Sequence, residues 1–305
     1  EDILEFDHVL LRDVLLQDMS GKRSLKELHK LAAEAKIEFF GDRVDSKAPE
    51  IVEHYRRARE PKGVYIYTLK AARAAANASD LKQAMQLYRE AEQLAESANA
   101  EQAEGLLANA SYVLETEEVA LEVAHLERRV GEYASAREHY RKLLASDDME
   151  IALWARWGLG KLSERQASMQ EAEGWFEAAQ REARTAEDLG EARIADVVDA
   201  FSLHELGRLA AIRSDDESAE SMFQEALAKA QKRSQRALEA KILADLCTLY
   251  SRHGDYDRAS ELHQRSIILA ESIGDSELVA EVRMVMSEFL VDVGRIDEAV
   301  KALKE

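Results

Sequence analysis

The sequence predicts an all-α protein made of helical hairpins packed side by side. Two prolines and thirteen glycines in 305 residues leave few helix breakers, and alanine, leucine, glutamate, arginine and lysine, which favour helices, dominate the rest. A hairpin-like pattern also recurs along the chain, with a small or flexible residue followed by an alanine at a fixed distance. Both observations disfavour a predominantly β fold.

Composition restricts the partners and the compartment. Lys and Arg number 41 against 60 Asp and Glu, which gives a net charge of −19 and disfavours a nucleic-acid phosphate backbone as the partner. No apolar run approaches the roughly 18 residues of a membrane span. The single cysteine, Cys247, excludes an internal disulfide and fits a reducing compartment. Residues 1–10 lack the pattern of a secretion signal, so we expect a cytoplasmic protein.

The repeat is visible at the turn and in the helix that follows it. A turn-like residue stands five positions before an alanine in six strings: SDLKQA, GEYASA, ASMQEA, SDDESA, GDYDRA and GRIDEA. The alanines that end these strings are Ala84, Ala136, Ala172, Ala219, Ala259 and Ala299. Four residues later come Tyr88, Tyr140, Phe176, Phe223 and His263, and spacings of four and seven place such side chains on one buried helix face.

The helix before each turn contributes a small residue. Gly160, Gly207 and Cys247 stand at matching offsets, where a small side chain permits close approach of the next helix. This position predicts that Cys247 is a buried, inert thiol, and the seam position of His263 predicts a packing histidine.

These residues resemble the tetratricopeptide repeat (TPR), with GDYDRA and GEYASA as near matches to its turn. The resemblance implies a right-handed superhelical solenoid over residues 64–305 with about six repeats. Alanine-to-alanine spacings of 52, 36, 47, 40 and 40 exceed the ~34 residues of the standard repeat. They are more similar to the long-helix variety found in kinesin light chains and bacterial signalling ATPases. The first spacing indicates an insertion near 98–115, as an extra or an extended helix.

Residues 1–63 differ from the repeats and form an expected N-terminal helical segment. They resemble the segment that follows the ATPase core in bacterial STAND proteins, including adenylyl-cyclase-linked ATPases. The residues that carry this resemblance are Phe6, His8, Leu11, Arg12, Leu28, His29 and Ala32. Because the chain has no Gly-x-x-x-x-Gly-Lys-Ser/Thr loop, the resemblance implies the sensor or scaffold region of a larger ATPase-type regulator, cut from its parent protein.

The sequence contains no recognisable catalytic motif. The eight histidines form no HExxH motif, and no Gly-x-Ser-x-Gly elbow occurs, so zinc hydrolysis and a nucleophilic serine have no support. The acid pairs Asp147-Asp148 and Asp215-Asp216 lie at turns, where aspartate caps helices. We expect no enzyme activity, no cofactor and no metal.

Function is instead expected on the groove lined by the first helix of each pair. Trp154, Trp157, Lys161 and Arg165 follow one helical stripe. The other residues predicted to line the groove are Arg73, Asn77, His125, Arg128, His204, Arg208, Lys241 and Arg252. This basic, aromatic set favours an acidic peptide or protein partner. The alternative is that both tryptophans fill the core between repeats and that the arginines are ordinary solvated residues.

Three functions follow from this pattern. The leading one is a non-catalytic protein-interaction scaffold within a signalling ATPase-type regulator. The second is a self-associating structural module, in which exposed terminal repeats stack on another copy as a homo-oligomer. The third is the regulatory part of a transcription regulator of the same ATPase class, although no DNA-binding domain is legible in this chain.

Overall fold

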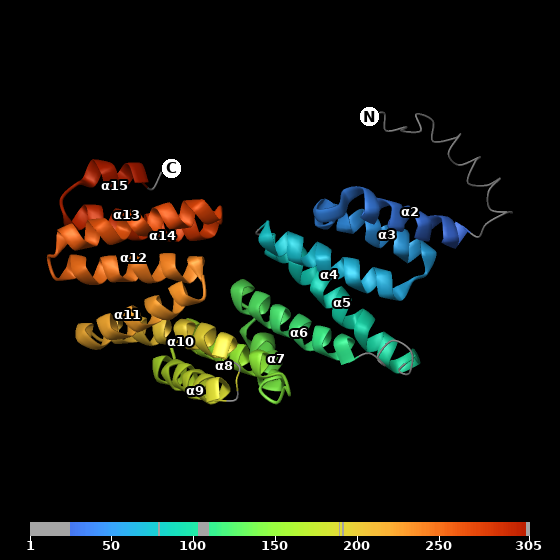
Figure 1. Cartoon of the computed structure of the whole chain (residues 1–305), viewed down its shortest axis with the longest axis horizontal. Coiled ribbons are helices and arrows are strands. Elements are labelled where there is room, and N and C mark those ends of the chain that lie inside the picture. Colours follow the sequence, from blue (N-terminus) through green and yellow to red (C-terminus); the bar gives the residue numbers. More distant parts are fainter. Residues whose placement is uncertain (1–24, 79, 103–109, 189, 191, 303–305) are drawn as a thin grey trace. The chain divides into compact units, whose positions relative to one another are not determined.

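The computed structural model describes residues 25–78, 80–102, 110–188, 190 and 192–302. Every regular element in these ranges is helical, so the predicted all-α class is confirmed (Figure 1). The chain forms two compact units, residues 1–139 and 140–305. Phe6, His8, Leu11 and Arg12 of the N-terminal motif lie outside the described residues.

The described part of the first unit contains seven helical segments. They are α2 (Leu25–Phe40), the 3₁₀ turn η1 (Gly41–Lys47), α3 (Ala48–Ala58), α4 (Pro61–Asn77), α5 (Leu81–Gln102), α6 (Ala110–Val130) and the first part of α7 (Tyr133–Leu143). Pro61 opens α4, because proline at the first helical position lacks only an amide that would have no helical partner. The expected boundary at 63/64 thus falls inside the first helix of the first repeat.

The stretch of the expected insertion spans the end of α5 and the start of α6. Helices α5 and α6 have 22 and 21 residues, against 17 in α12. Residues 98–102 belong to α5 and residues 110–115 to α6, on either side of a stretch outside the described residues. Helices α9 and α10 have 20 and 21 residues, so helix length alone does not distinguish the stretch near 98–115, and the insertion stays a prediction.

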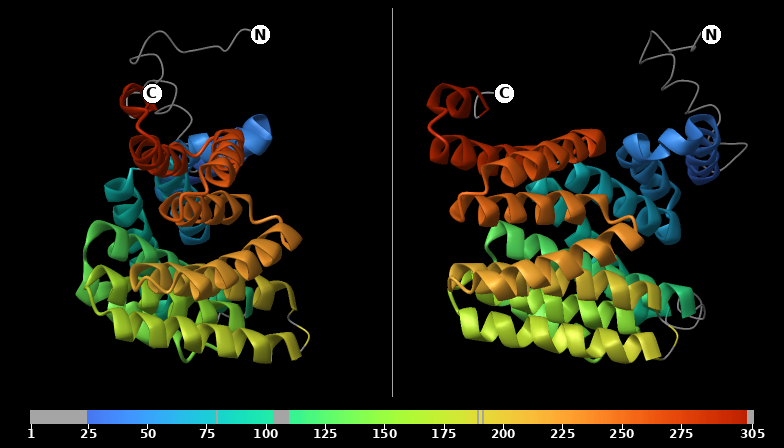
Figure 2. Two further views of the ribbon diagram at one scale, coloured as in Figure 1. Left: turned by 90° about the vertical axis from the view of Figure 1, so that its left-hand side faces the viewer. Right: turned by 60° about the vertical axis from the view of Figure 1, so that its left-hand side comes forward.

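The second unit is a row of antiparallel helix pairs. Its first helices are α8 (Met149–Arg165), α10 (Ala192–Ile212), α12 (Arg236–Arg252) and α14 (Ser276–Asp292). Its second helices are α9 (Met169–Asp188), α11 (Asp216–Lys232), α13 (Tyr256–Ile273) and α15 (Ile296–Ala302). Successive first helices contact one another, and Figure 2 shows the pairs stacked in this order. This is the predicted TPR-like solenoid.

Turn chemistry explains where the hairpins reverse. Ala167, Ser214, Gly254 and Gly294 all have positive φ, between 59° and 79°, the left-handed conformation that ends a helix and that glycine adopts most easily. Asp148 then accepts hydrogen bonds from the amides of Glu150 and Ile151 at the start of α8, and Asp215 caps α11 in the same way. The predicted capping role of these aspartates is confirmed.

Close packing of the pairs depends on the small residues that the repeat pattern identified. A Cβ on Gly160 would lie 2.7 Å from Cδ1 and 2.8 Å from Cζ of Phe176, and a Cβ on Gly207 would lie 2.8 Å from the ring of Phe223. Both rings are fully buried. Cys247 stands at the corresponding position of α12, is completely buried, and has its pKa raised by burial to about 12. The predicted burial of Cys247 as a packing residue is confirmed, and its inertness stays a prediction.

Candidate functional site

The predicted groove residues divide between the two units. Arg73, Asn77, His125 and Arg128 belong to the first unit, and the other eight belong to the second. Each set is therefore considered within its own unit.

Of the two first-unit residues on α6, His125 contributes no positive charge. Arg73 is exposed on α4, with a nitrogen 3.9 Å from a carboxylate oxygen of Glu118, and Asn77 is the last residue of α4. His125 is half-buried on α6, three residues before Arg128. Burial, assisted by the Arg128 charge, lowers the pKa of His125 to about 3. His125 is thus neutral at physiological pH.

An aromatic cluster lies between α8 and α10 in the second unit. The ring centroids of Trp154 and Trp157 are 5.6 Å apart, and Phe201 lies 5.1 Å from the first and 5.7 Å from the second. All three contacts are edge-to-face, a favourable arrangement of aromatic rings. All three side chains are half-buried, and Trp157 also packs against the core cluster that includes Phe176. The tryptophans therefore fill part of the seam between repeats and keep part of their surface exposed.

A partly buried ion network lies next along the same two helices. Lys161 Nζ contacts Glu164 at 2.6 Å and Glu205 at 3.0 Å, and Arg208 contacts the same two carboxylates at 3.2 and 2.8 Å. Burial by itself would raise the pKa of Glu205, but the nearby Lys161, His204 and Arg208 lower it to about 2. The two cations are neutralised by two carboxylates, so this part of the surface carries no net charge.

Two further predicted residues also have acidic partners. His204 is almost fully buried and donates from Nε2 to Asp245 Oδ2 at 2.6 Å. Lys241 Nζ lies 2.6 Å from Glu281. These pairs join α10 to α12 and α12 to α14, so they connect neighbouring repeats.

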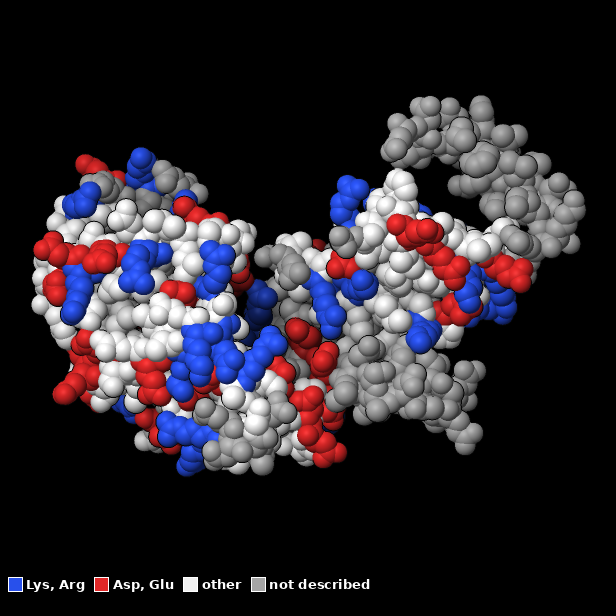
Figure 3. Space-filling model, in the orientation of Figure 1, with Lys and Arg blue, Asp and Glu red and all other residues white. Residues whose placement is uncertain are grey.

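Arg252 and Arg165 lie at the carboxyl ends of their helices. Arg252 pairs with Asp216 at the start of α11 and donates to the carbonyl oxygen of Ala211 at 3.2 Å, which places it at a turn. Arg165 is exposed at the end of α8 and has no ion pair among the residues that the structure describes. Lys and Arg gather over α8 and α10 in Figure 3, with acidic side chains beside them.

The sequence analysis missed the acids and one aromatic residue of this surface. Glu164 follows Lys161 by three residues, and Glu205 precedes Arg208 by three, a spacing at which helix side chains meet. Phe201 precedes His204 by three residues and so lies on the same stripe of α10. From these spacings alone, the sequence could have predicted that acids neutralise the cations and that Phe201 joins the two tryptophans.

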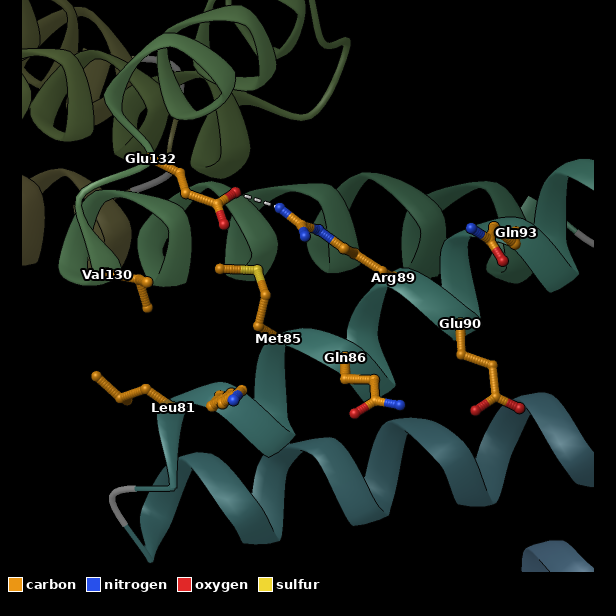
Figure 4. Close-up of a pocket in the computed structure, with 9 residues that line it drawn as sticks. Leu81, Met85, Gln86, Arg89, Glu90, Gln93, Val130 and Glu132 are labelled. Carbon is orange, nitrogen blue, oxygen red and sulfur yellow. Dashed lines mark hydrogen bonds and ion pairs between the residues drawn. The ribbon is translucent and has the colours of Figure 1, made fainter.

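A cavity of about 850 Å³ lies away from the predicted groove, in the first unit. Helix α5 forms its floor, and the end of α6 and the following turn form its wall (Figure 4). Leu81, Met85 and Val130 line its apolar side, and the ion pair between Arg89 and Glu132 crosses its rim.

Two kinds of site are absent from the described ranges. No three His, Cys, Asp or Glu residues there come together as a metal site. Within the same ranges, every helix is too short or too polar to span a bilayer.

Comparisons with known proteins identify the fold. No protein-family model and no curated protein matches the sequence. Among solved structures, a Rap protein complexed with competence and sporulation factor superposes with a TM-score of 0.64 at 15% identity, over 97% of this chain and 80% of that one. Aspartyl phosphate phosphatase F from Bacillus subtilis gives 0.61 at 13% identity, over 96% and 76%. The quorum sensor NprR from B. thuringiensis gives 0.56 at 11% identity, over 97% and 91%. At these identities the likeness concerns the fold, which is that of TPR-like helical repeat proteins.

Proposed function

We propose that this chain is a non-catalytic, cytoplasmic scaffold that binds a peptide or protein segment across α8 and α10. The observation that carries the proposal is the half-buried aromatic trio of Trp154, Trp157 and Phe201, with the exposed Arg165 two turns further along α8. Aromatic rings held in a rigid packed frame and a nearby arginine are the usual anchors of protein interfaces. The complex of the Rap protein with competence and sporulation factor shows that a similar fold binds a partner.

The preference for an acidic partner rests on Arg165. Lys161 and Arg208 already contact Glu164 and Glu205, so they have little charge left to offer. Arg165 has no such partner in the described part of the chain, and its guanidinium is suited to a carboxylate. We therefore place one acidic side chain of the ligand at Arg165 and an apolar or aromatic one on the trio.

The test uses peptides selected on the purified chain from a random twelve-residue phage-displayed library. We expect the double substitution Trp157→Phe with Arg165→Glu to weaken binding of the selected peptides at least tenfold by fluorescence anisotropy. The matched control is Trp175→Phe with Arg181→Glu, which changes one half-buried tryptophan and one exposed arginine of α9. The control should bind like the parent chain. Equal binding by both double variants, or the absence of any selected peptide, would refute the proposal.

The regulatory context is a second part of the proposal. The resemblance at Leu28, His29 and Ala32 supports a place after the ATPase core of a STAND-type regulator. Leu28, His29 and Ala32 all lie on α2, where His29 Nδ1 is 3.1 Å from His54 Nδ1 of α3. An upstream phosphate-binding loop in the same gene would support this context, and a gene without one would contradict it.

A further inference from the structure

The cavity of the first unit is lined by an apolar patch and by a polar stripe of α5. The apolar patch consists of Leu81 and Met85 of α5 and Val130 at the end of α6 (Figure 4). Met85 is buried and Leu81 is half-buried, and both pack against the core cluster of this unit, whereas Val130 is 48% exposed. The polar stripe, in which spacings of four, three and four place the side chains on one side of the helix, consists of Lys82, Gln86, Arg89 and Gln93.

The corresponding surface of α9 in the second unit is closed by an ion pair. Counted from the seam alanines, Met85 corresponds to Glu173 of α9. Counted from the left-handed turns that follow, Val130 corresponds to Arg213. Arg213 donates to both carboxylate oxygens of Glu173, at 2.8 and 2.7 Å. A bidentate ion pair thus joins α9 to the next turn.

An ion pair also joins α11 to the turn after it. Asp216 of α11 and His253 stand at the positions of Leu81 and Val130, and His253 Nε2 lies 2.8 Å from Asp216 Oδ2. In the first unit these positions carry apolar side chains. An ion pair of this kind therefore cannot form between α5 and the next turn, and the space is left as a cavity of about 850 Å³.

One charged residue of the cavity lining has no ionic partner among the residues that the structure describes. Both acids of the lining are paired, Glu90 with Arg56 and Glu132 with Arg89. Lys82 is exposed and pairs with neither acid. The cavity therefore offers one free positive charge, at the start of α5.

Arg89 is held in place by a second carboxylate behind the rim. Glu127 is buried, and one of its oxygens lies 3.5 Å from a nitrogen of Arg89. Ser135 Oγ donates to Glu127 at 2.6 Å, and His139 Nδ1 lies 2.7 Å from the other oxygen. Because Arg89 is shared between Glu127 and Glu132, it forms a fixed rim and leaves the charge of Lys82 for a ligand.

We propose that this cavity binds a small amphipathic carboxylic acid. The apolar body of the ligand packs on the apolar patch, and its carboxylate meets the ammonium group of Lys82, the charge complement of that free cation. Gln86 follows Lys82 by one helical turn and can donate an amide N–H to the same carboxylate. A volume of about 850 Å³ lies within the roughly 300–1,000 Å³ of small-molecule sites.

The test titrates the full chain with decanoate in isothermal titration calorimetry. Decanoate should bind in a saturable manner. Octanoate is two methylene groups shorter and should bind about tenfold more weakly, because it buries less apolar surface. Decyltrimethylammonium has the same chain length and the opposite charge, and it should bind at least tenfold more weakly than decanoate.

Chain variants locate the site. Lys82→Gln should weaken decanoate binding about fivefold, and Lys82→Arg should retain it. Val130→Asp should weaken binding at least tenfold. The matched controls are Lys26→Gln, which changes an exposed lysine of α2, and Ile268→Asp, which changes a side chain of α13 that is 59% exposed. Both controls should bind like the parent chain.

Three results would overturn the proposal. They are no saturable binding of decanoate, equal affinity for decyltrimethylammonium, and equal effects of Lys82→Gln and Lys26→Gln. Circular dichroism checks that each variant remains folded, which the exposure of Lys82 and Val130 leads us to expect. Both residues lie in the first unit, so failure here would leave the function proposed for α8 and α10 untouched.

Discussion

The substitution Gly160→Ala measures how closely the two helices of a repeat approach each other. The added Cβ would lie 2.7 Å from Cδ1 and 2.8 Å from Cζ of Phe176, whereas ordinary contacts are at least 3.4 Å. Phe176 is completely buried, so its ring cannot move into solvent. Overpacking of this kind lowers the free energy of unfolding by about 1–3 kcal/mol. Replacing glycine by alanine inside a helix raises it by about 1 kcal/mol.

Gly174→Ala separates these two effects. Gly174 is exposed within α9, and a Cβ there would meet nothing within 4 Å, so this substitution should stabilise the chain by about 1 kcal/mol. In urea unfolding followed by circular dichroism, Gly160→Ala should be less stable than Gly174→Ala by about 1–3 kcal/mol. In a chain that already carries Phe176→Leu, Gly160→Ala should destabilise less than it does in the parent chain, because the smaller side chain leaves room for the added Cβ. Equal stability of the two alanine variants would show that the helices do not meet at Gly160.

Three further predictions concern the turns, a buried histidine and the thiol. Ser214 has φ 62°, so Ser214→Gly should raise the free energy of unfolding by about 0.5–1 kcal/mol in urea titrations, whereas Ser221→Gly inside α11 should lower it. Burial lowers the pKa of His263 to about 4 from 6.5, so the chain should lose up to about 3 kcal/mol of stability as the pH falls from 6.5 to 4. His263→Phe should abolish this part of the pH dependence, and an unchanged pH profile would contradict the assignment. Cys247 should react with Ellman's reagent only as fast as the chain unfolds, and rapid labelling of the native protein would contradict its burial.

The repeat architecture was predictable because its determinants are local. Each hairpin is determined by a left-handed turn, an alanine five residues later and an aromatic residue four residues after that. A one-dimensional array repeats these short-range interactions along the chain. The structure accordingly places Ala167 and Ser214 in left-handed turns and Phe176 and Phe223 against glycine. The order of the pairs along the second unit then follows from the order of the chain.

The charge of the candidate site could not be predicted in the same way, because it depends on contacts between residues on different helices, such as Lys161 and Glu205, which are 44 positions apart in the sequence. Counting cations along α8 and α10 indicates a basic surface, but Glu205 reaches back to Lys161. A buried cation without a partner would cost several kcal/mol, so the cations that fall in the seam between repeats are those that must be neutralised. A cation at an exposed helix end does not need an acidic partner, and Arg165 has none among the described residues. The proposed peptide site therefore uses an arginine at the end of a first helix and partly exposed aromatic side chains, while the ion pairs in the middle of the first helices join neighbouring repeats.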